Sequence, residues 1–173
     1  GALDDAPRAI AALRLARTRA PQAGALHVLL GEALAAAGQP ADGLAALEHA
    51  QGLPGGDEAA RAIGRLALAA GDVPRALAEL EDHAANDPRD AESLRLLADA
   101  RRDAGDLPGA IDALQRASAR MPERDAWHGA LGELHRAAGD ADAARARFER
   151  AHRLAPTEPA APSALAEMAL DDD

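Results

Sequence analysis

Six histidines are the side chains of this sequence best suited to acid–base or metal chemistry: His27, His49, His83, His128, His135 and His152. His128 and His135 are spaced two helical turns apart, so both would lie on one face of a helix. A zinc site needs a third converging ligand, and the His-Glu-x-x-His pattern is absent from the sequence. We therefore interpret the histidines as structural or surface residues and predict no metal site.

No catalytic constellation accompanies these histidines. The sequence contains no cysteine, no Gly-x-Ser-x-Gly nucleophile motif and no glycine-rich phosphate loop. Carboxylates are numerous but scattered along the chain, and sequence alone places no pair of them in a cleft. We predict that the chain has no catalytic residues, that it is not an enzyme and that it needs no cofactor.

The elements that position these residues follow one pattern, seen most clearly between Glu92 and Pro122. Apolar residues recur there at three- and four-residue spacing, first before a break at Gly105 and then again after it, as on one face of a helix. Gly105 suits the left-handed conformation that ends a helix, and Pro108 suits the first turn of the next one. The stretch predicts a helix, a tight turn, a second helix and a stop at Pro122.

The same pattern occurs four times along the chain. A turn glycine recurs at intervals of about 34 residues. Each turn glycine follows a small residue, precedes a large apolar residue and is followed by a closing proline. The turn glycines are Gly38, Gly71, Gly105 and Gly139, and the small residues are Gly31, Gly64, Ala98 and Gly132. The large apolar residues are Leu47, Leu80, Leu114 and Phe148, and the prolines are Pro54, Pro88, Pro122 and Pro156.

A two-helix unit repeated at this period is typical of a solenoid, and the chain resembles the tetratricopeptide repeat (TPR) family over nearly its whole length. The resemblance implies an all-α fold, a right-handed α-solenoid of helix-turn-helix repeats. We predict a single array over residues 1–173: a half repeat at 1–21, repeats at about 24–54, 57–88, 91–122 and 125–156, and a capping helix at about 159–171. Trp127 is expected to pack against the preceding repeat, although an aromatic residue at a helix start can also serve as a ligand platform.

Composition narrows the classes of partner. The formal net charge of −10 argues against general nucleic-acid binding, which needs cations to replace the phosphate counterions. No apolar run approaches the roughly 20 residues that span a membrane. The absence of lysine, with abundant alanine, glycine and proline, suggests a GC-rich bacterial genome. The compartment is left open, with the cytoplasm as the default expectation.

The TPR resemblance also nominates a binding surface. In this family the first helix of each pair lines a concave groove that binds protein or peptide segments. The positions that would face the groove are Arg61, Arg65, Arg95, Asp99, Arg102, Glu133 and Arg136. Arginine binds carboxylates through two parallel hydrogen bonds, so these residues favour an acidic peptide or a C-terminal carboxylate. The alternative is that the arginines pair with Glu58, Glu92, Asp99 and Glu133 and merely solvate the helices.

The sequence therefore predicts a protein–protein interaction scaffold or adaptor. The alternative is an accessory repeat domain of a larger bacterial enzyme, for example a transferase, whose catalytic domain lies outside these residues; flanking sequence would distinguish the two. Because the sequence opens at Gly1 rather than Met, we expect an excised fragment or a cloning remnant at its start. The helix expected at about 6–19 would then lack its partner helix. We expect its apolar stripe to be covered by upstream residues or by self-association; the stripe comprises Ala9, Ile10, Leu13 and Ala16.

Overall fold

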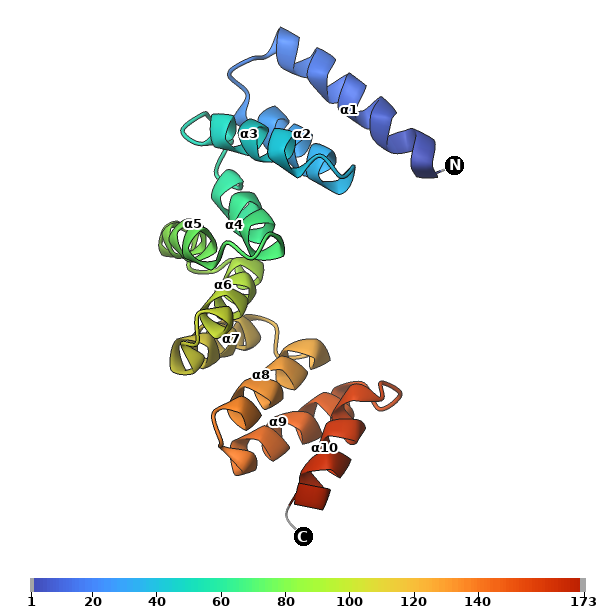
Figure 1. Ribbon diagram of the computed structural model, residues 1–173, viewed down its shortest axis with the longest axis vertical. Coiled ribbons are helices and arrows are strands. Elements are labelled where there is room, and N and C mark those ends of the chain that lie inside the picture. Colours follow the sequence, from blue (N-terminus) through green and yellow to red (C-terminus); the bar gives the residue numbers. More distant parts are fainter. Residues whose placement is uncertain (1, 172–173) are drawn as a thin grey trace. The chain divides into compact units, whose positions relative to one another are not determined.

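The computed structural model describes residues 2–171, and within that range it contains ten α-helices and no strand (Figure 1). The first five are α1 (Ala2–Arg19), α2 (Gly24–Ala36), α3 (Pro40–Ala50), α4 (Ala59–Ala69) and α5 (Val73–Asn86). The others are α6 (Ala91–Asp103), α7 (Leu107–Arg120), α8 (Asp125–Ala137), α9 (Ala141–Leu154) and α10 (Ala160–Asp171). The predicted all-α fold built from helix-turn-helix repeats is confirmed.

The protein forms two compact units, Gly1–Asn86 and Asp87–Asp173. In the first unit, α2 packs against α3 and α4 packs against α5, and α1 adds to the α2–α3 pair. In the second unit, the pairs are α6 with α7 and α8 with α9, and α10 packs against α9. Each unit thus contains two helical hairpins and one further helix.

The turns inside the hairpins depend on glycine. Gly38, Gly71, Gly105 and Gly139 all have positive φ, between 75° and 82°, a conformation that costs a residue with a Cβ considerably more than glycine. In three hairpins the aspartate after the glycine then starts the second helix. The side chains of Asp72, Asp106 and Asp140 accept hydrogen bonds from the backbone N–H groups of Arg75, Gly109 and Ala143. The conformation of the turn is therefore stabilised in two ways: glycine tolerates the positive φ, and the aspartate caps the helix that follows.

Each hairpin is closed by the small and large residues that the repeat pattern pairs. A Cβ atom added to Gly31 would lie 2.6 Å from Cγ of Leu47, and one added to Gly64 would lie 2.5 Å from Cγ of Leu80. Gly132 meets the ring of Phe148 in the same way, with Cε1 at 2.6 Å from the added Cβ. The small residue lets the two helices approach until the large one fills the space between them.

Helix α1 differs from its prediction at its start. It begins at Ala2 and continues through Pro7, before the expected start near residue 6. Ile10 is buried with Leu30, Leu34 and Ala46 of α2 and α3. This part of the apolar stripe is therefore covered inside the first unit, while Leu15 on another face of α1 is 56 % exposed.

Helix α10 begins at Ala160 and ends at Asp171. Pro162 lies in its first turn, where a proline removes no intrahelical hydrogen bond. Ala164 and Met168 pack against Phe148 of α9 in one buried cluster. The helix consequently covers apolar side chains that the last hairpin leaves open.

Candidate partner-binding surface

The predicted groove residues lie on the first helices of three hairpins. Arg61 and Arg65 are on α4, in the first unit. The others are on α6 and α8, in the second unit: Arg95, Asp99, Arg102, Glu133 and Arg136. The structure thus divides the set between two units, and each part has its own internal contacts.

In the first unit, the α4 arginines contact carboxylates of the same unit. Nη2 of Arg65 donates a hydrogen bond of 2.6 Å to Oε1 of Glu32, which connects α4 to α2. Arg61 forms an ion pair with Glu58, one turn earlier in the sequence. The Arg65 side chain is still 48 % exposed. Each guanidinium is therefore held in place without being removed from solvent.

In the second unit, Arg95 contacts two carboxylates of its own helix. Its Nε and Nη2 atoms donate to the carboxylate of Glu92, with the shortest distance 2.7 Å, and Nη1 donates to Oδ2 of Asp99 at 2.5 Å. The hydrogen bonds that Arg95 donates to Glu92 raise the pKa of Arg95, an effect that burial of the side chain opposes. Arg95 therefore stays charged and is oriented by two carboxylates of its own helix.

A cavity of about 380 Å³ lies beside Arg95, within the second unit. Arg95 and Asp99 form part of its wall with Arg124, Trp127 and other side chains of α6, α7 and α8. Trp127 is only 3 % exposed, and the guanidinium carbon of Arg124 is 5.2 Å from its ring centroid. Trp127 thus packs in the core, as expected from the repeat, and also forms one wall of the cavity.

Two further arginines complete the predicted set. Arg102 contacts Asp99 at 3.5 Å and Asp103 at 3.0 Å, and Nη2 of Arg136 lies 2.6 Å from Oε2 of Glu133. The ion pairs that the solvation alternative requires are therefore present. All of these pairs are partly exposed, and exposed pairs contribute little to stability, typically about 0–1 kcal/mol.

Two histidines make contacts with backbone carbonyl groups that the sequence pattern did not specify. Nε2 of His27 lies 2.9 Å from the carbonyl oxygen of Pro21, and Nε2 of His128 lies 2.9 Å from that of Pro122. A carbonyl can only accept, so Nε2 is the protonated nitrogen in both rings. The two residues occupy equivalent repeat positions, and a histidine six residues after a closing proline would have been the signal to notice.

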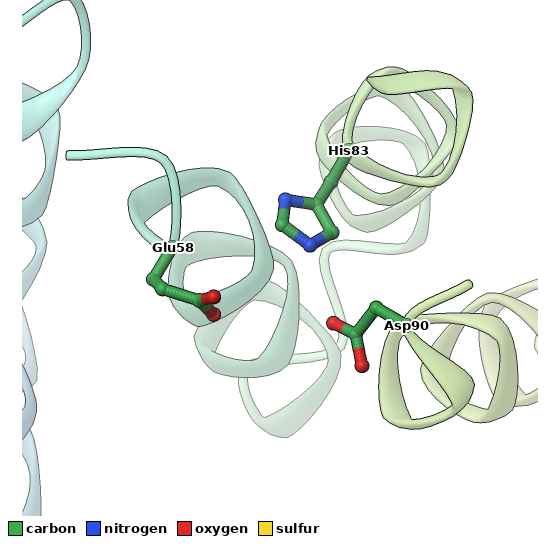
Figure 2. A group of neighbouring side chains, drawn as sticks. All are labelled: Glu58, His83 and Asp90. Atoms are coloured by element: carbon green, nitrogen blue, oxygen red, sulfur yellow. The ribbon is translucent and has the colours of Figure 1, made fainter. Parts of the chain in front are cut away.

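Three other side chains are of types that can bind metal ions. Figure 2 shows Glu58 before α4, His83 on α5 and Asp90 before α6. Glu58 pairs with Arg61, and His83 lies on the buried face of α5. Asp90 caps α6, because its carboxylate accepts hydrogen bonds from the N–H of Glu92 and the hydroxyl of Ser93. We assign no metal site to them.

Among the helices that the structure describes, none is both long and apolar enough to cross a membrane. Comparison with curated protein sequences gives no match. Solved structures do resemble the protein. A structure described as MamA RS-1 ArsTM double mutant is 25 % identical with a TM-score of 0.79, and the match covers 86 % of this chain and 84 % of that one.

A second solved structure, MamA 41-end from Desulfovibrio magneticus RS-1, is 24 % identical with a TM-score of 0.79, covering 88 % of this chain and 87 % of that one. The Cut9–Hcn1 hetero-tetramer of the APC/C gives 19 % identity and a TM-score of 0.75, covering 98 % of this chain and 34 % of that one. Two tetratricopeptide repeat models match the sequence, at residues 61–124 and 101–168. Together these matches span more than half of the chain, which belongs to the tetratricopeptide repeat family.

Proposed function

We propose that this protein-interaction module is a scaffold or adaptor that binds a partner along the first helices of its hairpins. The partner segment would carry carboxylates, either as acidic side chains or as a C-terminal carboxylate. The observation that supports this best is the cavity in the second unit, because Arg95 and Asp99 line it together with Arg124 and Trp127. Arginine with a neighbouring apolar wall suits a peptide that offers both charge and an apolar side chain.

Binding at Arg95 does not require its internal contacts to break. A guanidinium has five N–H donors in a fixed arrangement, and the contacts with Glu92 and Asp99 use only some of them. A partner carboxylate would therefore add to an arginine that is already oriented. Since an exposed pair contributes little alone, affinity must come from several arginines acting together.

The acidic members of the predicted set restrict the partner further. Asp99 lines the same cavity as Arg95, and Glu133 pairs with Arg136 on α8. Like charges facing each other across an interface suppress wrong partners. The favoured segment consequently places its carboxylates at the arginines and backbone N–H groups or neutral side chains at Asp99 and Glu133. These two carboxylates would repel a uniformly acidic segment.

Affinity capture with the intact protein, followed by mass spectrometry, would identify the partner. The combination Arg65→Glu with Arg95→Glu should then weaken binding by about tenfold or more, with helicity unchanged. Binding should also weaken as salt rises, since exposed charges are screened.

The combination Arg147→Glu with Arg150→Glu is the matched control, because it changes the same charge on α9, a second helix of its hairpin. Equal binding by both double variants would show that the arginines on the first helices only solvate the protein. Loss of binding in both would indicate attraction to the overall charge alone.

A further inference from the structure

A larger cavity lies in the first unit, away from the predicted groove residues. Its volume is about 650 Å³. Arg14, Arg17 and Thr18 of α1 form one wall, and residues of α3, among them Asp42 and His49, form the opposite wall. Leu30 and Leu34 of α2 also line the cavity, and both are buried apolar side chains. The cavity is therefore a cleft between α1 and α3, with α2 at its base.

Within the part of the chain that the structure describes, no carboxylate pairs with the two arginines of this cleft. Among the side chains that the structure describes, neither Arg14 nor Arg17 has a hydrogen-bond or ion-pair partner. Asp42 lies on the facing wall, yet among the described contacts no ion pair joins it to Arg14. Two cations thus face an open cleft in a protein whose formal net charge is −10.

Helices α3 and α5 show which contacts the positions equivalent to Arg14 and Arg17 make in the next repeat. Nη2 of Arg75 lies 2.5 Å from Oε1 of Glu48, and Nε2 of Gln51 donates to Oε2 of Glu79 at 2.7 Å. In the repeat alignment, Arg14 and Arg17 correspond to Glu48 and Gln51.

On the facing helix, Asp42 corresponds to Arg75 and Ala46 corresponds to Glu79. Ala46 offers no carboxylate, so Arg17 lacks the kind of polar partner that Gln51 has. Among the described side chains, the contacts that bridge α3 and α5 therefore have no counterpart between α1 and α3.

We propose that the cleft between α1 and α3 binds an acidic segment of a partner polypeptide, with its carboxylates on Arg14 and Arg17 and an apolar side chain over Leu30 and Leu34. This site does not depend on the first-helix surface proposed above. Charge complementarity supports the assignment, because the two arginines offer charge-assisted hydrogen bonds that no side chain of the described protein takes up. A bound peptide would then offer Arg14 and Arg17 the kind of polar contacts that α3 and α5 make with each other.

A peptide suits the cleft better than a small inorganic anion. A cavity of about 650 Å³ is in the size range of sites for ligands much larger than phosphate. Asp42 on the facing wall would repel a compact dianion, whereas a peptide can turn an N–H group toward it. The apolar lining from Leu30 and Leu34 adds a contact that an inorganic anion cannot use.

The test is a fluorescence-anisotropy titration of the intact protein with a labelled peptide of alternating leucine and aspartate, blocked at both ends. The combination Arg14→Gln with Arg17→Gln should weaken binding by about tenfold. The matched control is Arg8→Gln with Arg19→Gln, which removes the same charge from α1 at positions that do not line the cleft. The control should bind like the parent, and circular dichroism should show unchanged helicity for both.

Three outcomes would overturn the proposal. The first is equal weakening by both α1 combinations, which would mean attraction to the charge of α1 as a whole. The second is loss of binding only in Arg65→Glu with Arg95→Glu, which would place the peptide on the first helices. The third is full competition by inorganic phosphate at the same concentration as the peptide, which would indicate a small-anion site. A peptide with asparagine in place of every aspartate should not bind.

Discussion

Arg95 in the second unit and Arg17 in the first unit both line a cavity, but they differ in what surrounds them. Arg95 contacts the carboxylates of Glu92 and Asp99 on its own helix. Arg17 has no such partner among the described residues. The difference shows that an arginine at a cavity wall is either already oriented by its own protein or left available to another molecule.

The helices themselves explain the difference. Side chains three and four residues apart are neighbours on a helix, and Arg95 has a carboxylate at both spacings, in Glu92 and Asp99. Around Arg17 the corresponding positions hold Leu13, Arg14, Ala20 and Pro21. Local sequence thus accounts for the difference between Arg95 and Arg17, and four substitutions test this comparison.

Leu114→Ala should have the largest effect. Leu114 is 2 % exposed and lines the Arg95 cavity, so its truncation should lower the free energy of unfolding by about 2–5 kcal/mol. Urea denaturation would measure this. Leu15→Ala, at a side chain that is 56 % exposed, should change it by less than about 0.5 kcal/mol. Equal stability of the two variants would show that the repeat register is wrong.

Ile10→Ala should destabilise the cavity between α1 and α3, because it weakens the packing of α1, which forms one wall of that cavity. Ile10 holds α1 against Leu30, Leu34 and Ala46, and a buried isoleucine truncated to alanine costs about 2 kcal/mol or more. Amide hydrogen exchange in α1 should accelerate, while exchange in α8 and α9 should stay the same. Unchanged exchange in α1 would mean that this contact does not hold the helix.

Ala45→Glu would bring a carboxylate to the cavity between α1 and α3, because Ala45 is exposed and lines that cavity. The new side chain should compete for Arg14 and Arg17 and weaken binding of the leucine–aspartate peptide by about tenfold. Stability should change by less than about 1 kcal/mol, as for other exposed pairs. If the variant bound the peptide as tightly as the parent, the peptide would bind somewhere other than this cavity.

Glu92→Gln should have the smallest effect, in the opposite direction. It removes one of the carboxylates that contact Arg95 and leaves that arginine more available to a partner. Binding of a partner at the Arg95 cavity should tighten by about threefold or less, since such a helical pair is worth about 0.3–0.5 kcal/mol. Isothermal titration calorimetry with a captured partner would measure it. Weaker binding would mean that Glu92 orients Arg95 for the partner.

Sequence reasoning succeeded where backbone geometry leaves one choice. A turn that needs positive φ selects glycine, so Gly38 and Gly105 identified the hairpin turns. Close helix packing selects a small residue opposite a large one, as at Gly64 and Leu80. Both constraints recur in every repeat, and repetition made them visible.

Side-chain pairing was harder to predict. Periodicity gives the face of a helix on which a residue lies, but not the partner that its side chain reaches. The contact of Arg65 with Glu32 on another helix and the burial of Ile10 by α2 and α3 depend on three-dimensional packing. The cavity between α1 and α3 was missed for the same reason, because its walls are separate in sequence.

The most direct test of arginine-mediated partner binding is an NMR titration of the ¹⁵N-labelled protein with the leucine–aspartate peptide. We expect amide shifts around Arg14 and Arg17 on α1, with saturation that weakens as salt rises. The arginines of α9, such as Arg147 and Arg150, serve as the internal reference. Shifts spread equally over α9, or no shifts near Arg14 and Arg17, would contradict the assignment of the cavity between α1 and α3 as the binding site of the peptide.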